Sequence, residues 1–168
     1  ATDYLPGDYK LALGMLHLHI ALARSVTGKK DLALQDLQNQ LTKDRGEAIY
    51  MTRLMAGIYY INQFAGTLSL ARNEAQQIQS ITKKQKLAYS YNMSICMEGT
   101  ACFCACELHK ALQLFCAASE NRYNLHKGVA LDAMAGKAIT LQLLNRSAEA
   151  DKYLEELESF EKESNLAG

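Results

Sequence analysis

The sequence holds one cluster of side chains that could bind a metal ion. Cys102, Cys104 and Cys106 are followed by Glu107 and His109. Thiolates and imidazoles are good ligands for soft metals, and this run lies near an expected turn where they could converge. Structural zinc sites, however, usually join two separated ligand pairs, and the sequence offers no second pair. Small cysteines packed between helices are the favoured alternative, so we predict no metal ligand and no cofactor.

The other groups that could act in catalysis are isolated. His17 and His19 lie two residues apart on one expected helix and therefore face different ways. His109 and His126 have no carboxylate or nucleophile at a telling spacing. No stretch has the spacing of a phosphate-binding G-x-x-x-x-G-K-[ST] loop. We therefore predict no catalytic and no cofactor-binding residue, and we expect that the chain is not an enzyme.

Composition and charge exclude several classes of protein. Of the 168 residues, 49% are hydrophobic and 21% are charged, and 18 basic residues balance 18 acidic ones. Such a chain can bury a core, and its neutrality argues against direct binding of nucleic acid. We also expect no membrane association, since no apolar run is long enough to span a bilayer and no secretory signal is present.

Cysteine usage indicates the compartment. The count of five is odd, and four of them fall between Cys96 and Cys106, unlike the spread of a disulfide framework. We expect reduced thiols and a cytoplasmic location. Because the sequence begins with Ala1, we also expect a piece of a longer polypeptide.

The segment from Gly128 to Ser164 carries the clearest structural pattern, two helical patterns around the turn Asn145-Arg146-Ser147. Asparagine tolerates the left-handed conformation that ends a helix, and Ser147 can cap the next one. The remaining face of the second helix is acidic, and we expect it to be solvated. The apolar stripe of this helix comprises Ala150, Tyr153, Leu154, Leu157 and Phe160. One inner and one outer helix form the unit of an α-solenoid.

Weaker copies of this helix pair precede it. Six further helices are expected near residues 9–26, 30–42, 47–62, 66–81, 87–103 and 107–120. A small residue recurs in each second helix, at separations of 36, 42 and 39 residues, and another lies twelve residues before it. These packing positions are Ala33, Ser69, Ala111 and Ala150, preceded by Ala21, Gly57, Gly99 and Ala138. The matching turn positions are Gly28, Phe64, Cys106 and Asn145, of which Phe64 and Cys106 do not suit a left-handed conformation.

These patterns predict an all-α fold. We expect a right-handed α-α superhelix of about four TPR-like (tetratricopeptide-like) helical hairpins that form a single domain over residues 1–168. The repeats cover approximately residues 9–43, 46–82, 86–121 and 124–164. The alternative is a compact helical bundle, because small residues are common there too.

A set of methionines could line a groove of such a superhelix. In this register Met15, Met51 and Met93 each lie six residues before a small position of a first helix. Methionine makes an adaptable apolar surface, so this row, with Met55 and Met97, is our candidate groove for a ligand or partner. Asp132 replaces methionine in the last repeat. Ordinary core between repeats is the favoured alternative.

Three stretches resemble a known family. They are Asp31-Leu32-Ala33-Leu34, Asn121-Arg122-Tyr123 and the run from Leu131-Asp132-Ala133-Met134-Ala135-Gly136 to Leu144-Asn145-Arg146-Ser147-Ala148-Glu149-Ala150. The pattern resembles tetratricopeptide repeats, and more narrowly the divergent repeats of bacterial LuxR-type (maltose-regulon-activator-like) signal-transduction NTPase regulators. The chain departs from the usual repeat in lacking its closing proline and early tryptophan and in exceeding about 34 residues per unit.

The resemblance implies a role in sensing. In that family the repeats lie between an ATPase module and a helix-turn-helix, and they bind an inducer or an inhibitory protein. The first functional hypothesis is therefore a non-catalytic sensor module of a transcription regulator, with a protein, peptide or small effector in its groove. The alternative is a general TPR-like scaffold or adaptor without a transcriptional role, and a homo-oligomer is compatible with both. A metal-binding or enzymatic domain built on the cysteine run is the weakest hypothesis.

Overall fold

Every regular element in the described part of the chain is a helix. The computed structural model describes residues 9–43 and 47–166. In chain order its elements are α1 (Lys10–Val26), α2 (Lys30–Lys43), α3 (Ala48–Phe64), α4 (Leu68–Lys84), α5 (Ala88–Cys104), α6 (Leu108–Glu120), the short 3-10 helix η2 (Arg122–Asn124), α7 (Lys127–Leu143) and α8 (Ser147–Leu166). The predicted all-α class is confirmed, and the α-helices end within three residues of the expected positions.

Five turns between helices share one hydrogen-bond pattern. In each, the amide of a residue with positive φ donates to the carbonyl three residues earlier, and the next amide donates to the carbonyl five residues earlier. In the first turn the Gly28 amide donates to Ser25 at 3.1 Å and the Lys29 amide to Arg24 at 2.9 Å. This is the Schellman motif, which satisfies the last carbonyls of a helix. The positive-φ residues, called turn residues below, are Gly28, Gly66, Lys86, Cys106 and Asn145.

The turn residues correct two predictions from the sequence, namely that Phe64 is the turn position of the second hairpin and that Cys106 does not suit a left-handed conformation. Phe64 is the last residue of α3, and the left-handed residue of the second hairpin is Gly66. Glycine has no Cβ, so it adopts this conformation without steric cost. Cys106 also adopts it, with φ of 59°, although its side chain does not favour positive φ. Asn145, with φ of 58°, is a turn residue as predicted.

A buried alanine follows the turn of every hairpin at the same distance. Five residues after each hairpin turn residue the chain has an alanine with 2% or less of its surface exposed. These residues are Ala33, Ala71, Ala111 and Ala150, at separations of 38, 40 and 39. Ser69, which the sequence analysis assigned to this position, is exposed. The error of two residues follows from placing the turn at Phe64 instead of Gly66.

The small residues of the first helices divide into two kinds. Ala21, Gly99 and Ala138 each lie seven residues before a turn residue, and all three are buried as predicted. The equivalent residue of the second hairpin is Tyr59, which is also buried. Gly57 is buried but lies two residues earlier, so its small size serves a different contact.

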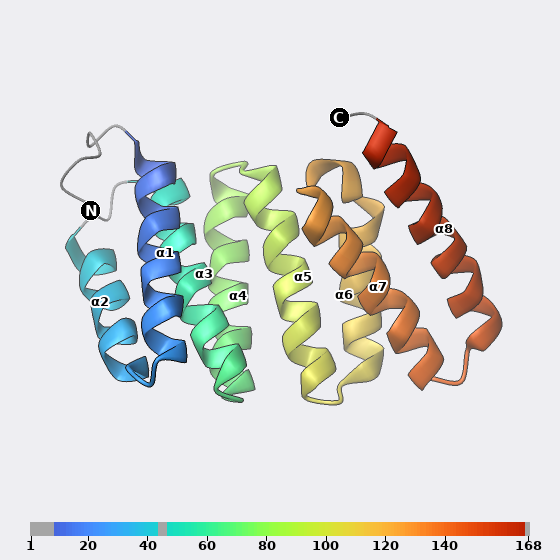
Figure 1. The fold of residues 1–168 in the computed structure, drawn as a ribbon, viewed down its shortest axis with the longest axis horizontal. Coiled ribbons are helices and arrows are strands. Elements are labelled where there is room, and N and C mark those ends of the chain that lie inside the picture. Colours follow the sequence, from blue (N-terminus) through green and yellow to red (C-terminus); the bar gives the residue numbers. More distant parts are fainter. Residues whose placement is uncertain (1–8, 44–46, 167–168) are drawn as a thin grey trace. The chain divides into compact units, whose positions relative to one another are not determined.

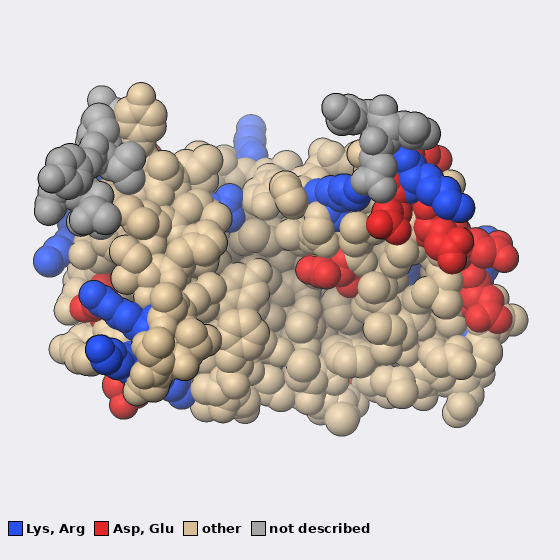
Figure 2. Space-filling model, viewed as in Figure 1, with Lys and Arg blue, Asp and Glu red and all other residues tan. Residues whose placement is uncertain are grey.

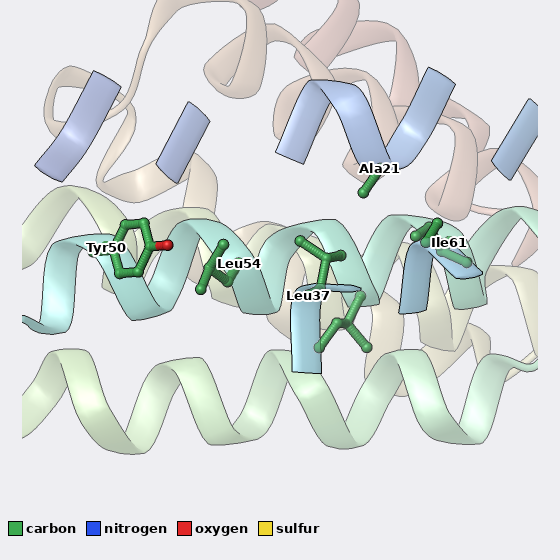
Figure 3. Close-up of a cluster of buried hydrophobic side chains, with 7 residues drawn as sticks. Ala21, Leu37, Tyr50, Leu54 and Ile61 are labelled. Atoms are coloured by element: carbon green, nitrogen blue, oxygen red, sulfur yellow. The ribbon is translucent and has the colours of Figure 1, made fainter. Parts of the chain in front are cut away.

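The chain divides into two compact units, unit 1 over residues 1–90 and unit 2 over residues 91–168. In unit 1, α3 contacts α1, α2 and α4, and α1 contacts α2 (Figure 1). The second hairpin therefore packs its first helix against both helices of the first hairpin. Figure 3 shows the resulting core, in which Tyr50, Leu54 and Ile61 of α3 lie near Ala21 and Leu37.

Gly57 allows α3 to approach the first hairpin. A Cβ atom at Gly57 would lie 2.9 Å from Cδ1 of Leu37 on α2 and 3.6 Å from Cα of Leu18 on α1. Because non-bonded heavy atoms essentially never approach a Cβ atom to within 3.0 Å, a larger residue would displace the Leu37 side chain or the helices beside it.

Unit 2 repeats this contact with different residues. Its helix α7 contacts α6, α8 and η2, and a core that includes Ile95, Phe115 and Ala133 joins α5, α6 and α7. A Cβ atom at Gly136 would lie 2.7 Å from Cζ of Phe115. Gly57 and Gly136 both lie nine residues before a turn residue, and Leu37 and Phe115 both lie nine residues after one. The two units therefore join their hairpins through equivalent positions.

Helix α8 has the acidic, solvated face that was expected. Seven of its twenty residues are acidic and two are basic, and Figure 2 shows acidic side chains gathered over it. Glu155, Glu158 and Glu161 are exposed. Ser147, expected to be the cap, is instead the first helical residue, and the carbonyl of Arg146 accepts the first helical bond from Ala150.

The predicted apolar stripe of α8 is narrower than expected. Leu154 is 46% exposed, whereas Ala150 and Phe160 are buried. Leu154 lies nine residues after its turn residue, the position at which Leu37 and Phe115 are each covered by the next hairpin of their unit. None of the helices in the described residues combines the length and apolarity needed to cross a membrane.

Candidate ligand pocket in unit 2

The cysteine run does not form a ligand cluster. Cys102 is buried on α5, whereas Cys104 and Cys106 are exposed. Across residues 9–43 and 47–166, no three His, Cys, Asp or Glu side chains lie close enough to hold a metal ion. Burial, with a smaller contribution from Asp132, raises the pKa of Cys96 to about 12. The Cys96 thiol therefore stays protonated at neutral pH, which makes it a poor ligand and a poor nucleophile.

Three of the four histidines make contacts within the fold. The His17 ring meets the edge of Tyr50 with 6.1 Å between ring centroids, and burial lowers the pKa of His17 despite the opposing effect of Asp36. His19 is exposed, with Nδ1 2.7 Å from the Met15 carbonyl oxygen. His126 caps α7, where its Nδ1 accepts from the Gly128 amide at 3.2 Å. The exposed His109 has no catalytic group paired with it among these contacts.

The methionines do not form one continuous row. The corrected register places Met15 and Met93 thirteen residues before a turn residue, where the second and last hairpins have Arg53 and Asp132. Met51 is therefore not equivalent to the other two. Met55, Met93 and Met97 are 4–6% exposed, Met51 is half-buried and Met15 is 37% exposed. A ligand could reach only Met15 and Met51 without local opening of the fold.

A pocket of about 410 Å³ lies between α6, α7 and α8 of unit 2. This volume falls within the usual range of small-molecule sites. Helix α6 supplies Leu112, Gln113, Cys116, Ala117 and Glu120, α7 supplies Lys137 and Leu141, and the last turn and α8 supply Arg146, Glu149 and Tyr153. The pocket thus combines an apolar wall with four charged side chains.

Lys137 is the most buried of these charged residues. Only 7% of its surface is exposed, and its Nζ lies 3.4 Å from the centroid of the Tyr153 ring. A cation–π contact of this kind is worth about 0.5–2 kcal/mol. The described residues give Lys137 no ion pair or hydrogen bond besides this contact. Its positive charge therefore lies at the pocket wall without a direct ion pair, although the carboxylates of Glu120 and Glu149 line the same pocket.

In the preceding hairpin, a charge at the equivalent position is balanced by an ion pair. Glu98 lies eight residues before its turn residue, as Lys137 does, and it is 4% exposed. Lys110, four residues after that turn residue, places its Nζ 3.2 Å from the Glu98 carboxylate. A charge in this buried position needs such a partner, because desolvation of an unpaired ion is costly.

In the last hairpin the residue equivalent to Lys110 is Glu149, and it pairs with Arg146 instead of Lys137. Glu149 lies four residues after Asn145, so Lys137 and Glu149 match Glu98 and Lys110 with both signs reversed. Glu149 instead accepts two hydrogen bonds from Arg146, each 2.7 Å long. This bidentate pair lowers the pKa of Glu149 and keeps its carboxylate ionised. Lys137 and Glu149 therefore line the same pocket, but Glu149 is paired with Arg146 and not with Lys137.

Sequence reasoning missed Lys137, although a signal was present. Eight residues before the turn residues of the first two hairpins stand Ile20 and Ile58. With the correct register, a lysine at a position that holds isoleucine in the first two hairpins would have marked a buried charge, and thus a candidate site. That register required Gly66 to be recognised as a turn residue.

Comparisons with known proteins do not add to this description. No known protein family, no curated protein and no solved structure matches the chain. The site is therefore defined by the geometry of this chain alone.

Proposed function

We propose that this chain is a non-catalytic binding module built as a right-handed, TPR-like α-α superhelix of four hairpins. The observation that carries the proposal is the repeated hairpin geometry, with a Schellman turn, a buried alanine five residues later and, at the equivalent position of each unit, a glycine contact between hairpins. Repeats of this kind usually present extended surfaces for ligands or partners. The pocket at Lys137 is a candidate for such a surface.

Solution scattering tests the architecture. A compact chain of this length has a radius of gyration of about 15 Å. An extended superhelix should give a clearly larger value, whereas a value at or below that of the compact chain would favour the helical bundle.

A binding screen tests the activity. We expect at least one compound or peptide, from a panel of metabolites and short peptides, to bind the purified chain saturably in a calorimetric assay. The bound compound should be recovered unchanged, because a binding module performs no reaction. Chemical conversion of the compound would contradict the proposal.

The role of sensor in a LuxR-type transcription regulator is a narrower proposal. It rests on the resemblance of three stretches and on the binding role proposed above. The sequence of the full-length gene product tests it: a flanking NTPase and a helix-turn-helix would support it, and their absence would favour a general scaffold.

A further inference from the structure

We infer that the pocket between α6, α7 and α8 binds a small organic acid, with its carboxylate on Lys137 and its apolar body against Leu112 and Leu141. This inference names the ligand class for the binding module proposed above and therefore rests on that proposal. It uses three independent observations: a formed pocket, a nine-tenths buried lysine in its wall, and a diverted counterion.

The charge of the ligand follows from Lys137. Its ammonium group lies over the Tyr153 ring and forms no ion pair with a carboxylate of the described residues. In the preceding hairpin, Glu98 occupies the position equivalent to Lys137, and Nζ of Lys110 lies 3.2 Å from its carboxylate. A ligand carboxylate at Lys137 would restore this pairing, and a charge-assisted hydrogen bond in a partly buried site is among the stronger polar contacts.

The apolar part of the ligand follows from the remaining wall. Leu112, Ala117 and Leu141 line the pocket together with the ring of Tyr153. An inorganic anion would leave this apolar surface exposed to water, whereas a hydrocarbon chain would cover it and gain hydrophobic stabilisation. The Arg146–Glu149 pair is already neutral, and Glu120, the other charged residue of the lining, is exposed to solvent. Lys137 is therefore the buried charge that selects the ligand.

Glu149 makes the proposal sharply testable, because it lines the same pocket and matches the counterion position. If Arg146 were removed, the freed Glu149 carboxylate could pair with Lys137 and compete with the ligand. If Glu149 were removed, no internal competitor would remain. The two variants should therefore move affinity in different directions, although each removes one member of the same exposed pair.

The experiment is an NMR titration of the full chain with hexanoate, hexanamide and inorganic phosphate. Hexanoate should bind and shift the amide signals of residues around Lys137, Leu141 and Tyr153. Hexanamide and phosphate should bind at least tenfold more weakly, a difference of about 1.4 kcal/mol. Equal binding of either probe would overturn the proposal, because the first lacks the charge and the second lacks the apolar body.

Variants assign the contact. Lys137→Met should weaken hexanoate binding at least tenfold, and Lys152→Met, which removes a similar charge from the exposed face of α8, should leave it unchanged. Arg146→Gln should weaken binding severalfold, and Glu149→Gln should preserve or strengthen it. If Lys137→Met does not fold, the Arg146 and Glu149 variants decide the question. Wild-type affinity in Lys137→Met, or in Arg146→Gln, would overturn the assignment.

The outcome also separates this inference from the proposed function. Hexanoate shifts confined to residues outside the pocket would overturn the pocket assignment and leave a binding module standing. Conversion of the probe at the pocket would overturn the non-catalytic role and leave the assignment of the pocket standing.

Discussion

Unit 1 and unit 2 each have a pocket beside a hairpin, but they balance its charges differently. The unit 1 pocket, about 350 Å³ between α1 and α2, has Arg24 and Asp36 in its wall, and these two side chains pair with each other. The unit 2 pocket also contains an internal pair, Arg146 with Glu149. It contains in addition the exposed Glu120 and the buried Lys137, and neither of them belongs to that pair.

The two units also differ in the residue that stands eight positions before each hairpin turn residue. Eight residues before the turn residue, unit 1 has Ile20 and Ile58, whereas unit 2 has Glu98 and Lys137. The contact between hairpins is nevertheless equivalent in the two units. The packing of a hairpin pair therefore does not require an apolar residue at this position. Charges that packing does not require are candidates for recognition, since buried ions are otherwise costly.

The largest effect should come from filling the glycine contacts. Gly136→Leu in unit 2 and Gly57→Leu in unit 1 should each lower the free energy of unfolding by about 3 kcal/mol, because the new side chain overlaps Phe115 or Leu37. Urea denaturation followed by circular dichroism measures both changes.

A matched control and a double variant identify the cause. Gly128 lies near the start of α7, where an added Cβ atom would lie 3.6 Å from Nδ1 of His126, an ordinary contact distance. Gly128→Ala should therefore change stability by less than about 0.5 kcal/mol. Combining Gly136→Leu with Phe115→Ala should cost less than the sum of the single changes. A large loss of stability in one of the two glycine variants and none in the other would show that the contacts of the two units are not equivalent.

The ion pair between the buried Glu98 and the partly exposed Lys110 in unit 2 should give the next largest effect. Lys110→Met removes the cation that lies beside the buried Glu98 carboxylate and should lower the free energy of unfolding by about 2 kcal/mol. The double variant Glu98→Ile with Lys110→Met makes this position resemble unit 1 and should recover most of the loss. Thermal denaturation at neutral pH compares the variants. A double variant less stable than the single one would mean that unit 2 needs this pair for packing.

A smaller effect is expected at the turns. Cys106→Gly in unit 2 should raise the free energy of unfolding by about 1 kcal/mol, since φ of 59° is strained for cysteine, and Gly66→Ala in unit 1 should lower it by a similar amount. Ala105 has no positive φ, so Ala105→Gly should bring no gain. Chemical denaturation of the three variants gives the comparison, and equal stability of Cys106→Gly and the wild type would argue against strain at this turn.

Much of the fold could be predicted from local patterns. Helical spacing of apolar residues located the helices, and Asn145 marked its turn through its own conformational preference. The register of the second hairpin was missed because a glycine fits both a turn and the start of a helix. Placing Gly66 in the helix moved the turn to Phe64 and the buried small residue from Ala71 to Ser69.

The pocket could be predicted less well, for a physical reason. The sequence shows that Lys137 and Glu149 have opposite charges, but it does not show which cation Glu149 selects. That choice depends on the position of Arg146 beside the α8 N-terminus, where two 2.7 Å hydrogen bonds form. The partner of an exposed carboxylate is a property of the folded turn rather than of residue spacing.

The smallest effect concerns Glu74 of unit 1, whose position eight residues after Gly66 corresponds to Asp36 and Tyr153. Burial raises the pKa of Glu74 above its ordinary value of 4.5. Its protonated form is therefore favoured by folding, and wild-type stability should fall relative to Glu74→Gln as the pH rises from about 4.5 through the raised pKa.

The two proteins should be equally stable below pH 4.5 and should differ by a few tenths of a kcal/mol at pH 7, since solvent screens a partly exposed group. Urea denaturation across this pH range measures the difference, and Glu155→Gln on the exposed face of α8 is the control. A constant difference at all pH values would show that the substitution acts through packing. A difference that grows with pH would instead show that unit 1 contains a partly buried charge without a compensating partner. That charge, on Glu74, is negative, whereas the corresponding charge of unit 2, on Lys137, is positive.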